Sequence, residues 1–242
     1  MNIVRLLGYF ENLGKMHIIM EACDHSLRCE MAFAGNGGVD PTKAQTVITQ
    51  ILNGLNHCHE MHCLHRNLSP ENILVTVSGV VKIADFSKAV FLNDGNSSSS
   101  RTASISALVD IRYAAPEMLA LDPNLAVAAD VWSVGCILLE MMRGRLIWRG
   151  NTPEEQLKLI HKTVGPLLPH HAVVAMINVK SYRARGSSSG LGKTLRDYVT
   201  RASDPTCAFI EVELLDNSRF VLTLYYVKAS LPPTSWFFAK TL

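Results

Sequence analysis

The sequence lacks a marked excess of either charge. Lys and Arg total 23 and Asp and Glu total 21, which leaves a formal net charge of +2. A charge this small provides no strong attraction toward nucleic acid or an anionic membrane. We therefore expect no nucleic-acid partner and no membrane partner.

Long hydrophobic runs are also missing. The longest, such as residues 134–142, are broken by Gly and Glu, and they are well short of the roughly 18 to 20 residues that cross a membrane. The six cysteines have no regular spacing, and the N-terminus has no basic region followed by an apolar core. These absences predict a protein of the cytoplasm or the nucleus.

The composition is that of an ordinary folded protein. Its 242 residues are 48% hydrophobic, which allows one sizeable core or two small ones. Residues 3–10 and 16–22 are typical of two short strands joined by a turn at residues 12–15. Two further short strands are expected at residues 73–77 and 80–84.

Apolar residues at helical spacing predict three helices. The first begins at Pro41 and extends to about His59. The second covers residues 126–142 and is apolar on most of its faces, which indicates a buried helix. The third follows Pro153.

Other segments show no such pattern. Residues 93–106 are polar and Ser-rich, and we expect a loop inside one domain. From about residue 180 the composition changes, and residues 209–227 alternate apolar and polar side chains around a turn, as a possible β-hairpin does. The expected division is a domain at 1–170, a linker at 171–190 and a divergent tail at 191–242.

Three motifs follow one another along the chain. Residues 65–72 read HRNLSPEN, residues 85–87 read DFS, and residues 115–117 read APE. In order and spacing they resemble the motif series of the eukaryotic serine/threonine protein kinases. The resemblance extends over residues 1 to about 165, and the segment GNTPEEQL at 150–157 looks most like the cyclin-dependent and mitogen-activated kinase group.

This resemblance implies an α+β fold. The expected structure is a mainly helical kinase C-terminal lobe with a short remnant of the N-terminal sheet, followed by the divergent tail. The glycine-rich loop, the strand Lys and the helix Glu that hold ATP in the family are not found in a chain that begins at Asn2-Ile3-Val4. The kinase-like domain is therefore expected to be partial.

The resemblance also implies a cofactor site for Mg²⁺ and ATP. Asn72 and Asp85 match the family's metal ligands, and carboxylate and amide oxygens suit this cation. The adenine would contact residues of the hinge and of the floor beneath it, namely Met20, Glu21, Cys23, Leu74 and Ala84. Because half of the family's nucleotide site is missing, weak binding is expected.

Three positions depart from the family's catalytic pattern. The general-base Asp is Asn67, whose amide cannot take up a proton at neutral pH. The phosphate-contacting Lys is Ser69, and the Thr that bonds to both groups is Asp110. These changes predict a loss of phosphoryl transfer, with Asp110 acting as a displaced base as the alternative.

Four further residues match the structural and regulatory positions of the family. Asp130 would tie the catalytic loop, including His65, to the buried helix. Arg66 would either hold a phosphate on the Ser-rich loop or bond to nearby carbonyl groups. Glu117 would pair with an Arg that is not recognisable in the tail, which predicts a buried carboxylate without its partner and marginal stability.

Three functions remain open on the sequence alone. The first is a kinase-like protein deficient in phosphoryl transfer that acts by binding, with a cyclin-like protein or a scaffold as partner. The second is an active ATP-dependent serine/threonine kinase whose N-terminal lobe lies outside the given sequence. The third is a nonfunctional fragment with an unrelated tail.

Overall fold

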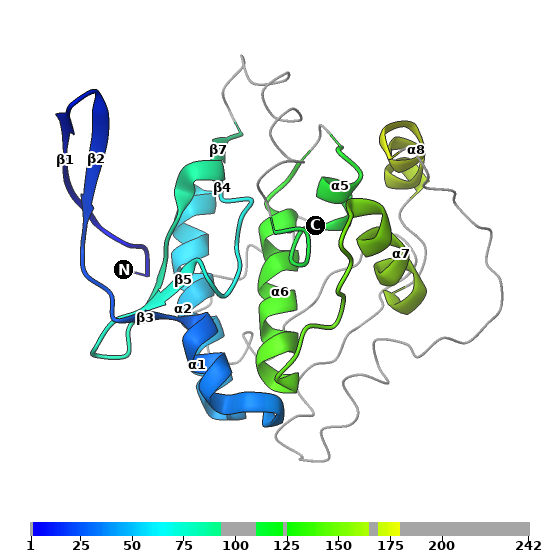
Figure 1. Ribbon diagram of the computed structural model, residues 1–242. Coiled ribbons are helices and arrows are strands. Elements are labelled where there is room, and N and C mark those ends of the chain that lie inside the picture. Colours follow the sequence, from blue (N-terminus) through cyan, green and yellow to red (C-terminus); the bar gives the residue numbers. More distant parts are fainter. Residues whose placement is uncertain (1, 93–109, 123–124, 165–168, 180–242) are drawn as a thin grey trace.

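The computed structural model describes residues 2–92, 110–122, 125–164 and 169–179. A β-hairpin lies at one side, the helices α2 and α6 form the centre, and the shorter helices α5, α7 and α8 lie beyond α6 (Figure 1). The predicted α+β fold with a mainly helical lobe is confirmed. No helix in the described ranges combines the length and the apolar character needed to cross a membrane.

The hairpin consists of β1 (Leu6–Asn12) and β2 (Lys15–Met20), which pair in antiparallel register. Leu13 and Gly14 form the turn with φ angles of 51° and 71°, as a two-residue turn of this hand requires. The predicted strand pair is present, with bounds shifted by a few residues. Many of its large apolar side chains are exposed: Leu6, Leu7, Tyr9, Phe10, Leu13, Met16, Ile18, Ile19 and Met20.

The first central helix is α2 (Pro41–Glu60), close to the predicted bounds. It begins after Asp40, whose carboxylate accepts a hydrogen bond from the Lys43 amide at 3.1 Å, and the proline occupies the first turn, where no amide hydrogen is needed. One face is buried by residues at helical spacing: Ala44, Val47, Ile48, Ile51, Leu55 and Cys58.

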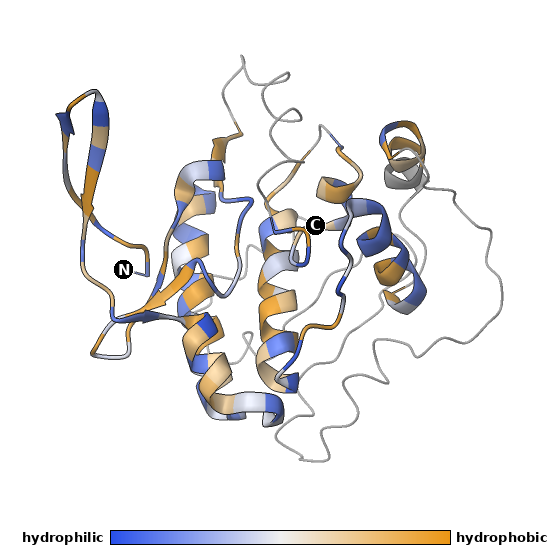
Figure 2. Cartoon of the chain, in the orientation of Figure 1, coloured by the Kyte–Doolittle hydropathy of each residue, from blue (hydrophilic) through white to orange (hydrophobic). Residues whose placement is uncertain are grey.

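The second central helix is α6 (Ala128–Arg143), which the sequence predicted at 126–142. Figure 2 shows that much of its length is apolar, and its residues from Ala129 to Met141 are buried with the exception of Val131. Gly144 ends the helix with a φ of 67°, and a Cβ there would collide with the Gly35 carbonyl. Only glycine suits this close approach.

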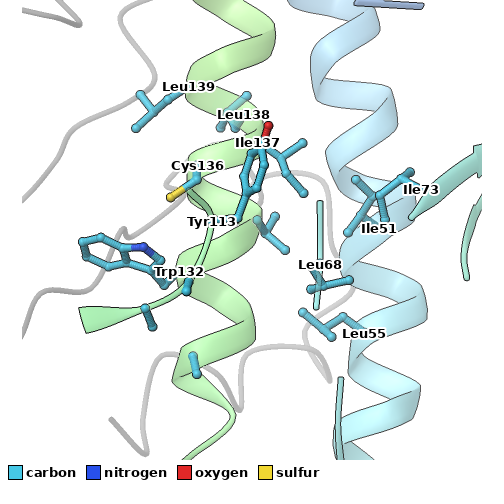
Figure 3. Close-up of a cluster of buried hydrophobic side chains, with 14 of the residues drawn as sticks. Ile51, Leu55, Leu68, Ile73, Tyr113, Trp132, Cys136, Ile137, Leu138 and Leu139 are labelled. Carbon is cyan, nitrogen blue, oxygen red and sulfur yellow. The ribbon is translucent and has the colours of Figure 1, made fainter. Parts of the chain in front are cut away.

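The hydrophobic core lies between α2 and α6 (Figure 3). Ile51 and Leu55 extend from α2 and Ile137 from α6, while Leu68 comes from the loop that precedes β5. All four are at most 2% exposed. Truncating a buried side chain of this size typically lowers the free energy of unfolding by about 2 to 5 kcal/mol. The burial of Leu68 in this core therefore holds its loop in position.

Small sheets hold the remaining loops in place. The strands β3 (His25–Ser26), β5 (Ile73–Val75) and β6 (Val81–Ile83) form one antiparallel sheet in that order. The strands β4 (Cys63–Leu64) and β7 (Val90–Phe91) form another. The segment 65–72 leaves β4 and enters β5, so both of its ends are anchored.

The remaining described helices are α1 (Leu27–Ala34), α5 (Pro116–Leu119), α7 (Pro153–Val164) and α8 (Pro169–Asn178), together with the 3₁₀ turns η1 (Gly35–Gly37) and η2 (Phe86–Lys88). The helix expected after Pro153 is α7. Part of the segment expected as a linker, residues 171–178, belongs to α8. The predicted loop at 93–106 and the tail with its possible hairpin lie outside the described residues.

Candidate functional site

Asp130 anchors the segment that follows β4. It lies in the first turn of α6 and is 0% exposed. Its Oδ2 accepts hydrogen bonds from the His65 amide and from His59 Nε2, both at 2.9 Å, and its Oδ1 accepts one from the Arg66 amide at 2.8 Å. A carboxylate also suits a helix N-terminus. Asp130 therefore ties the loop to the central helix.

His65 connects this loop to the segment after β6. Its Nε2 donates to the Ala84 carbonyl at 3.0 Å, so its Nδ1 is the acceptor for the Asn67 amide at 3.2 Å. The ring also meets Phe86 edge-on, with centroids 4.7 Å apart. Burial lowers the pKa of His65, and the ring is neutral at neutral pH. His65 is therefore a structural residue that sets two loops against each other.

Asp85 lies directly after that segment in the left-handed region, with φ 60° and ψ 69°. Its Oδ1 accepts from the Ser87 amide at 3.3 Å, and its Oδ2 accepts from the side-chain amide of Asn67 at 3.1 Å. Hydrogen bonding from Ser87 is the main reason that the pKa of Asp85 lies below its ordinary value. The group is an exposed carboxylate that is ionised at neutral pH.

Asn72 completes this cluster. Its side-chain amide donates to the Asn67 carbonyl at 2.8 Å, and its own carbonyl accepts from the Ala84 amide at 2.9 Å. The structure thus brings together Asn67, Asn72 and Asp85, which are separated by up to 18 positions in sequence. The group therefore offers the carboxylate of Asp85 and the amide oxygens of two Asn side chains as possible ligands. The side chain at residue 67 cannot take up a proton.

These residues fit a divalent cation only in part. Asn72 and Asp85 offer the neutral and anionic oxygens that Mg²⁺ accepts. The side-chain amide of Asn67, however, donates to Asp85 Oδ2 and so engages one of the two carboxylate oxygens. The cluster would therefore hold the cation through one charged group.

Ser69 and Asp110 lie at the other two substituted positions. Ser69 is buried in the loop, and its short side chain carries no charge. Asp110 is engaged by Arg112, whose Nε donates to its Oδ1 at 2.7 Å and whose amide donates to the same oxygen at 3.1 Å. This ion pair raises the pKa of Arg112. The role of Asp110 as a displaced base stays a prediction, for a carboxylate that Arg112 already engages.

The predicted nucleotide residues lie along one sheet and the segment that leads to it. Leu74 is half-buried in β5, Ala84 is buried after β6, and Met20 is exposed at the end of β2. Glu21 forms an ion pair with Lys82 at 2.7 Å, and this contact lowers the pKa of Glu21. Burial raises the pKa of the half-buried Cys23 thiol.

Arg66 also has a φ angle in the left-handed region, at 65°. Its Nε donates to the Lys88 carbonyl at 2.6 Å, as one of the two sequence-based alternatives expects. The Ser-rich segment that the other alternative involves lies outside the described residues. The phosphate-binding role of Arg66 therefore stays a prediction.

The sequence did not predict the network around Arg28. This α1 side chain donates from Nε to Glu71 and from Nη1 to Glu140, both at 2.8 Å, and from Nη2 to the Tyr113 hydroxyl. Tyr113 in turn donates to Glu140. The sequence did contain an indication of this network, because Glu140 lies within the apolar stretch that forms α6, and a buried Glu requires a partner. The network joins α1, the catalytic-loop segment and α6.

Glu117 has no ion pair with any of the described residues. Burial first, and then the nearby Asp122, raise its pKa. A carboxyl group with a raised pKa in the folded state loses its stabilising contribution as the pH rises through that value. Within the described ranges no cation offsets this burial, so the ionised form of Glu117 is less stable here than in water.

We expect Glu117→Gln to raise Tm near neutral pH by about 3 °C, the shift that about 1 kcal/mol produces in a chain of this size. At a pH below the ordinary carboxyl value of 4.5, both proteins carry a neutral side chain and the difference should vanish. Thermal unfolding at the two pH values measures this. A lower Tm for the variant near neutral pH would show that Glu117 has a cationic partner.

Comparison with known families identifies the class of protein. The model of the protein kinase domain matches residues 1–199, which includes the whole cluster around Asp85 and extends past the boundary expected at residue 170. The chain belongs to the protein kinase family, in the cyclin-dependent-kinase-like group. Members of this family generally use ATP and Mg²⁺.

Among the similar curated proteins is cyclin-dependent kinase-like 4 of Mus musculus, which is 38% identical over 73% of this chain and 50% of its own length. The Homo sapiens protein of the same name is 37% identical over 73% of this chain and 45% of its own. Cyclin-dependent kinase-like 1 of Caenorhabditis elegans is 33% identical over 73% of this chain and 48% of its own length. The chain spans about half the length of these relatives.

Proposed function

We propose that this chain is a cyclin-dependent-kinase-like protein that is deficient in phosphoryl transfer and acts by binding. The observation that carries the proposal is the hydrogen bond from the Asn67 amide to Asp85. At the position where the family has a proton acceptor, this chain has a donor that is already engaged. A substrate hydroxyl would find no acceptor for its proton there.

Two further substitutions support the deficiency. In the family, a Lys two residues after the base contacts the transferred phosphate, and the uncharged Ser69 cannot provide that contact. Asp110 is held by Arg112 and leaves the base position without a carboxylate. The positioning of the phosphate and the transfer of the substrate proton are therefore both impaired, and the two losses multiply in the rate of phosphoryl transfer.

Weak binding of ATP with Mg²⁺ is the second element of the proposal. Asn72 and Asp85 retain the oxygen ligands, and Leu74 and Ala84 lie beside them on β5 and after β6. These same residues favour the second candidate, an ATP-dependent serine/threonine kinase in which Asn67 is tolerated. The two candidates differ in what happens to bound ATP.

We expect a fluorescent ATP analogue to bind and to be displaced by ATP. Leu74→Ala removes apolar contact area and should weaken binding roughly tenfold, which corresponds to about 1.4 kcal/mol. Val77→Ala, at an exposed position two residues after β5, is the matched control and should bind as the original chain does. Bound ATP should be recovered intact after denaturation, whereas conversion to ADP at a kinase rate would favour the second candidate.

A protein partner is the third element. The exposed apolar side chains of the β1–β2 hairpin, such as Tyr9 and Ile18, form a surface of the kind that binds other proteins. We propose a cyclin-like protein or a scaffold as partner and the cytoplasm or the nucleus as location. The free thiols of the described cysteines are compatible with either reducing compartment.

A further inference from the structure

Within the described residues, the β1–β2 hairpin forms a two-stranded sheet of its own at one side of the lobe (Figure 1). Apolar side chains are exposed on both faces of this sheet. Tyr9 and its cross-strand partner Ile18 lie on one face and are 70% and 63% exposed, and Phe10 lies on the other face and is 47% exposed. An isolated two-stranded hairpin is at best marginally stable in water. A further strand at one of its edges would therefore stabilise it.

The two edges of this sheet differ. The pairing of β1 with β2 shifts by one residue between Leu6 and Gly8, which is an irregularity in β1. Bulges of this kind bend a strand and protect its edge against further pairing. The pairing of β2 is regular from Lys15 to Ile19. The edge of β2 is therefore the better template for another strand.

The backbone groups of β2 alternate in direction. Lys15 closes the two-residue turn as the hydrogen-bonded partner of Asn12, and six residues later the Glu21 amide donates to the Arg5 carbonyl at 3.0 Å. The odd-numbered residues of this stretch therefore direct their amides toward β1. The amides directed away from β1 belong to Met16, Ile18 and Met20.

These outward groups are complementary to themselves. In antiparallel pairing of β2 with β2 of a second copy, centred on Ile18, residue 18 lies opposite residue 18 and residue 16 lies opposite residue 20. All the outward amides and carbonyls of both strands then have partners. Because the arrangement has twofold symmetry, each contact occurs twice.

The charges of β2 agree with the same register. Pairing centred on Ile18 places Lys15 opposite Glu21 of the second copy, and no other centre does so. Opposite charges directly across an antiparallel pair stabilise it. Glu21 uses Oε1 for its contacts with Lys82 and the Arg5 amide, so its Oε2 can accept from the Lys15 side chain of the second copy.

We propose that two copies of this chain associate through the edges of β2, so that their hairpins form one four-stranded antiparallel sheet centred on Ile18. The inference goes beyond the proposed function, whose protein partner would bind the apolar faces of the hairpin rather than this edge. The outer strands of the combined sheet are the two irregular β1 strands. The assembly therefore ends at two copies.

Sedimentation velocity tests the association, under reducing conditions because Cys29 is exposed. The original chain should approach twice its mass of 26.7 kDa as its concentration rises. Ile18→Pro removes an outward amide and leaves the bonds between β1 and β2 in place, so it should remain a monomer at every concentration. Tyr9→Pro is the matched control on the β1 edge, directly opposite Ile18, and should dimerise as the original chain does. Circular dichroism checks that both variants are folded.

Exchanging the charges gives a second test. Lys15→Glu and Glu21→Lys each turn two attractive pairs into two repulsive ones, and each variant alone should associate at least about tenfold more weakly than the original chain. In an equal mixture of the two variants, every pair across the interface again joins opposite charges. The mixture should therefore dimerise as the original chain does.

Three results would overturn the inference. They are an original chain that remains a monomer at high concentration, a dimer that persists in Ile18→Pro, and a mixture of the charge variants that associates no better than either alone. Hydrogen exchange identifies a different occupant of the edge. Protection of the Ile18 amide should increase with protein concentration, and protection that does not depend on concentration would show that a segment of the same chain covers β2.

Discussion

Replacing Asp130 by alanine is expected to lower the free energy of unfolding by about 4 kcal/mol, a large share of the stability of an ordinary domain. The substitution leaves the His65 amide, the Arg66 amide and His59 Nε2 without their shared acceptor in a buried position. Unsatisfied buried donors are costly because water cannot replace the lost partner. Urea unfolding followed by circular dichroism measures the loss.

Two variants serve as controls for this prediction. Asp130→Asn keeps one carbonyl oxygen as acceptor and should cost less than Asp130→Ala. Asp24 is an exposed carboxylate that pairs with His25 at the surface, and Asp24→Ala should cost less than about 1 kcal/mol. If Asp130→Ala were no more destabilising than Asp24→Ala, the anchoring role of Asp130 would be wrong.

Much of the fold could be predicted because two independent signals agree. Apolar residues at helical spacing mark the buried faces of α2 and α6, and the motifs from His65 to Glu117 lie in the family's order between and around them. Local signals also placed the hairpin, since two apolar stretches flank the predicted turn at residues 12–15, where Leu13 and Gly14 have positive φ angles. These features depend on residues close together in the sequence.

The remaining features depend on contacts that no local pattern contains. The resemblance identifies Asn67 as a substituted base, but only the structure shows that its amide reaches Asp85. The Arg28 network joins residues up to 112 positions apart. Helix α8 (Pro169–Asn178) was not among the predicted helices, although the composition changes only after it.

Phosphoryl transfer is the other property for which a large effect is expected. Loss of the base alone commonly costs about 10² to 10⁴ in rate, and loss of the phosphate-contacting Lys removes positioning as well. Protein kinases usually turn over at about 1 to 100 per second. The chain should therefore reach at most about a hundredth of such a rate, and Asp85→Ala should leave this trace nearly unchanged.

The decisive measurement follows the transfer of labelled γ-phosphate from ATP with Mg²⁺ to a basic or proline-directed peptide. Cyclin-dependent kinase-like 4, assayed in parallel, tests whether the peptide and conditions are suitable. The proposed function predicts trace labelling for the 242-residue chain and for its Asp85→Ala variant alike. Labelling at about 1 to 100 per second that disappears in Asp85→Ala would contradict it.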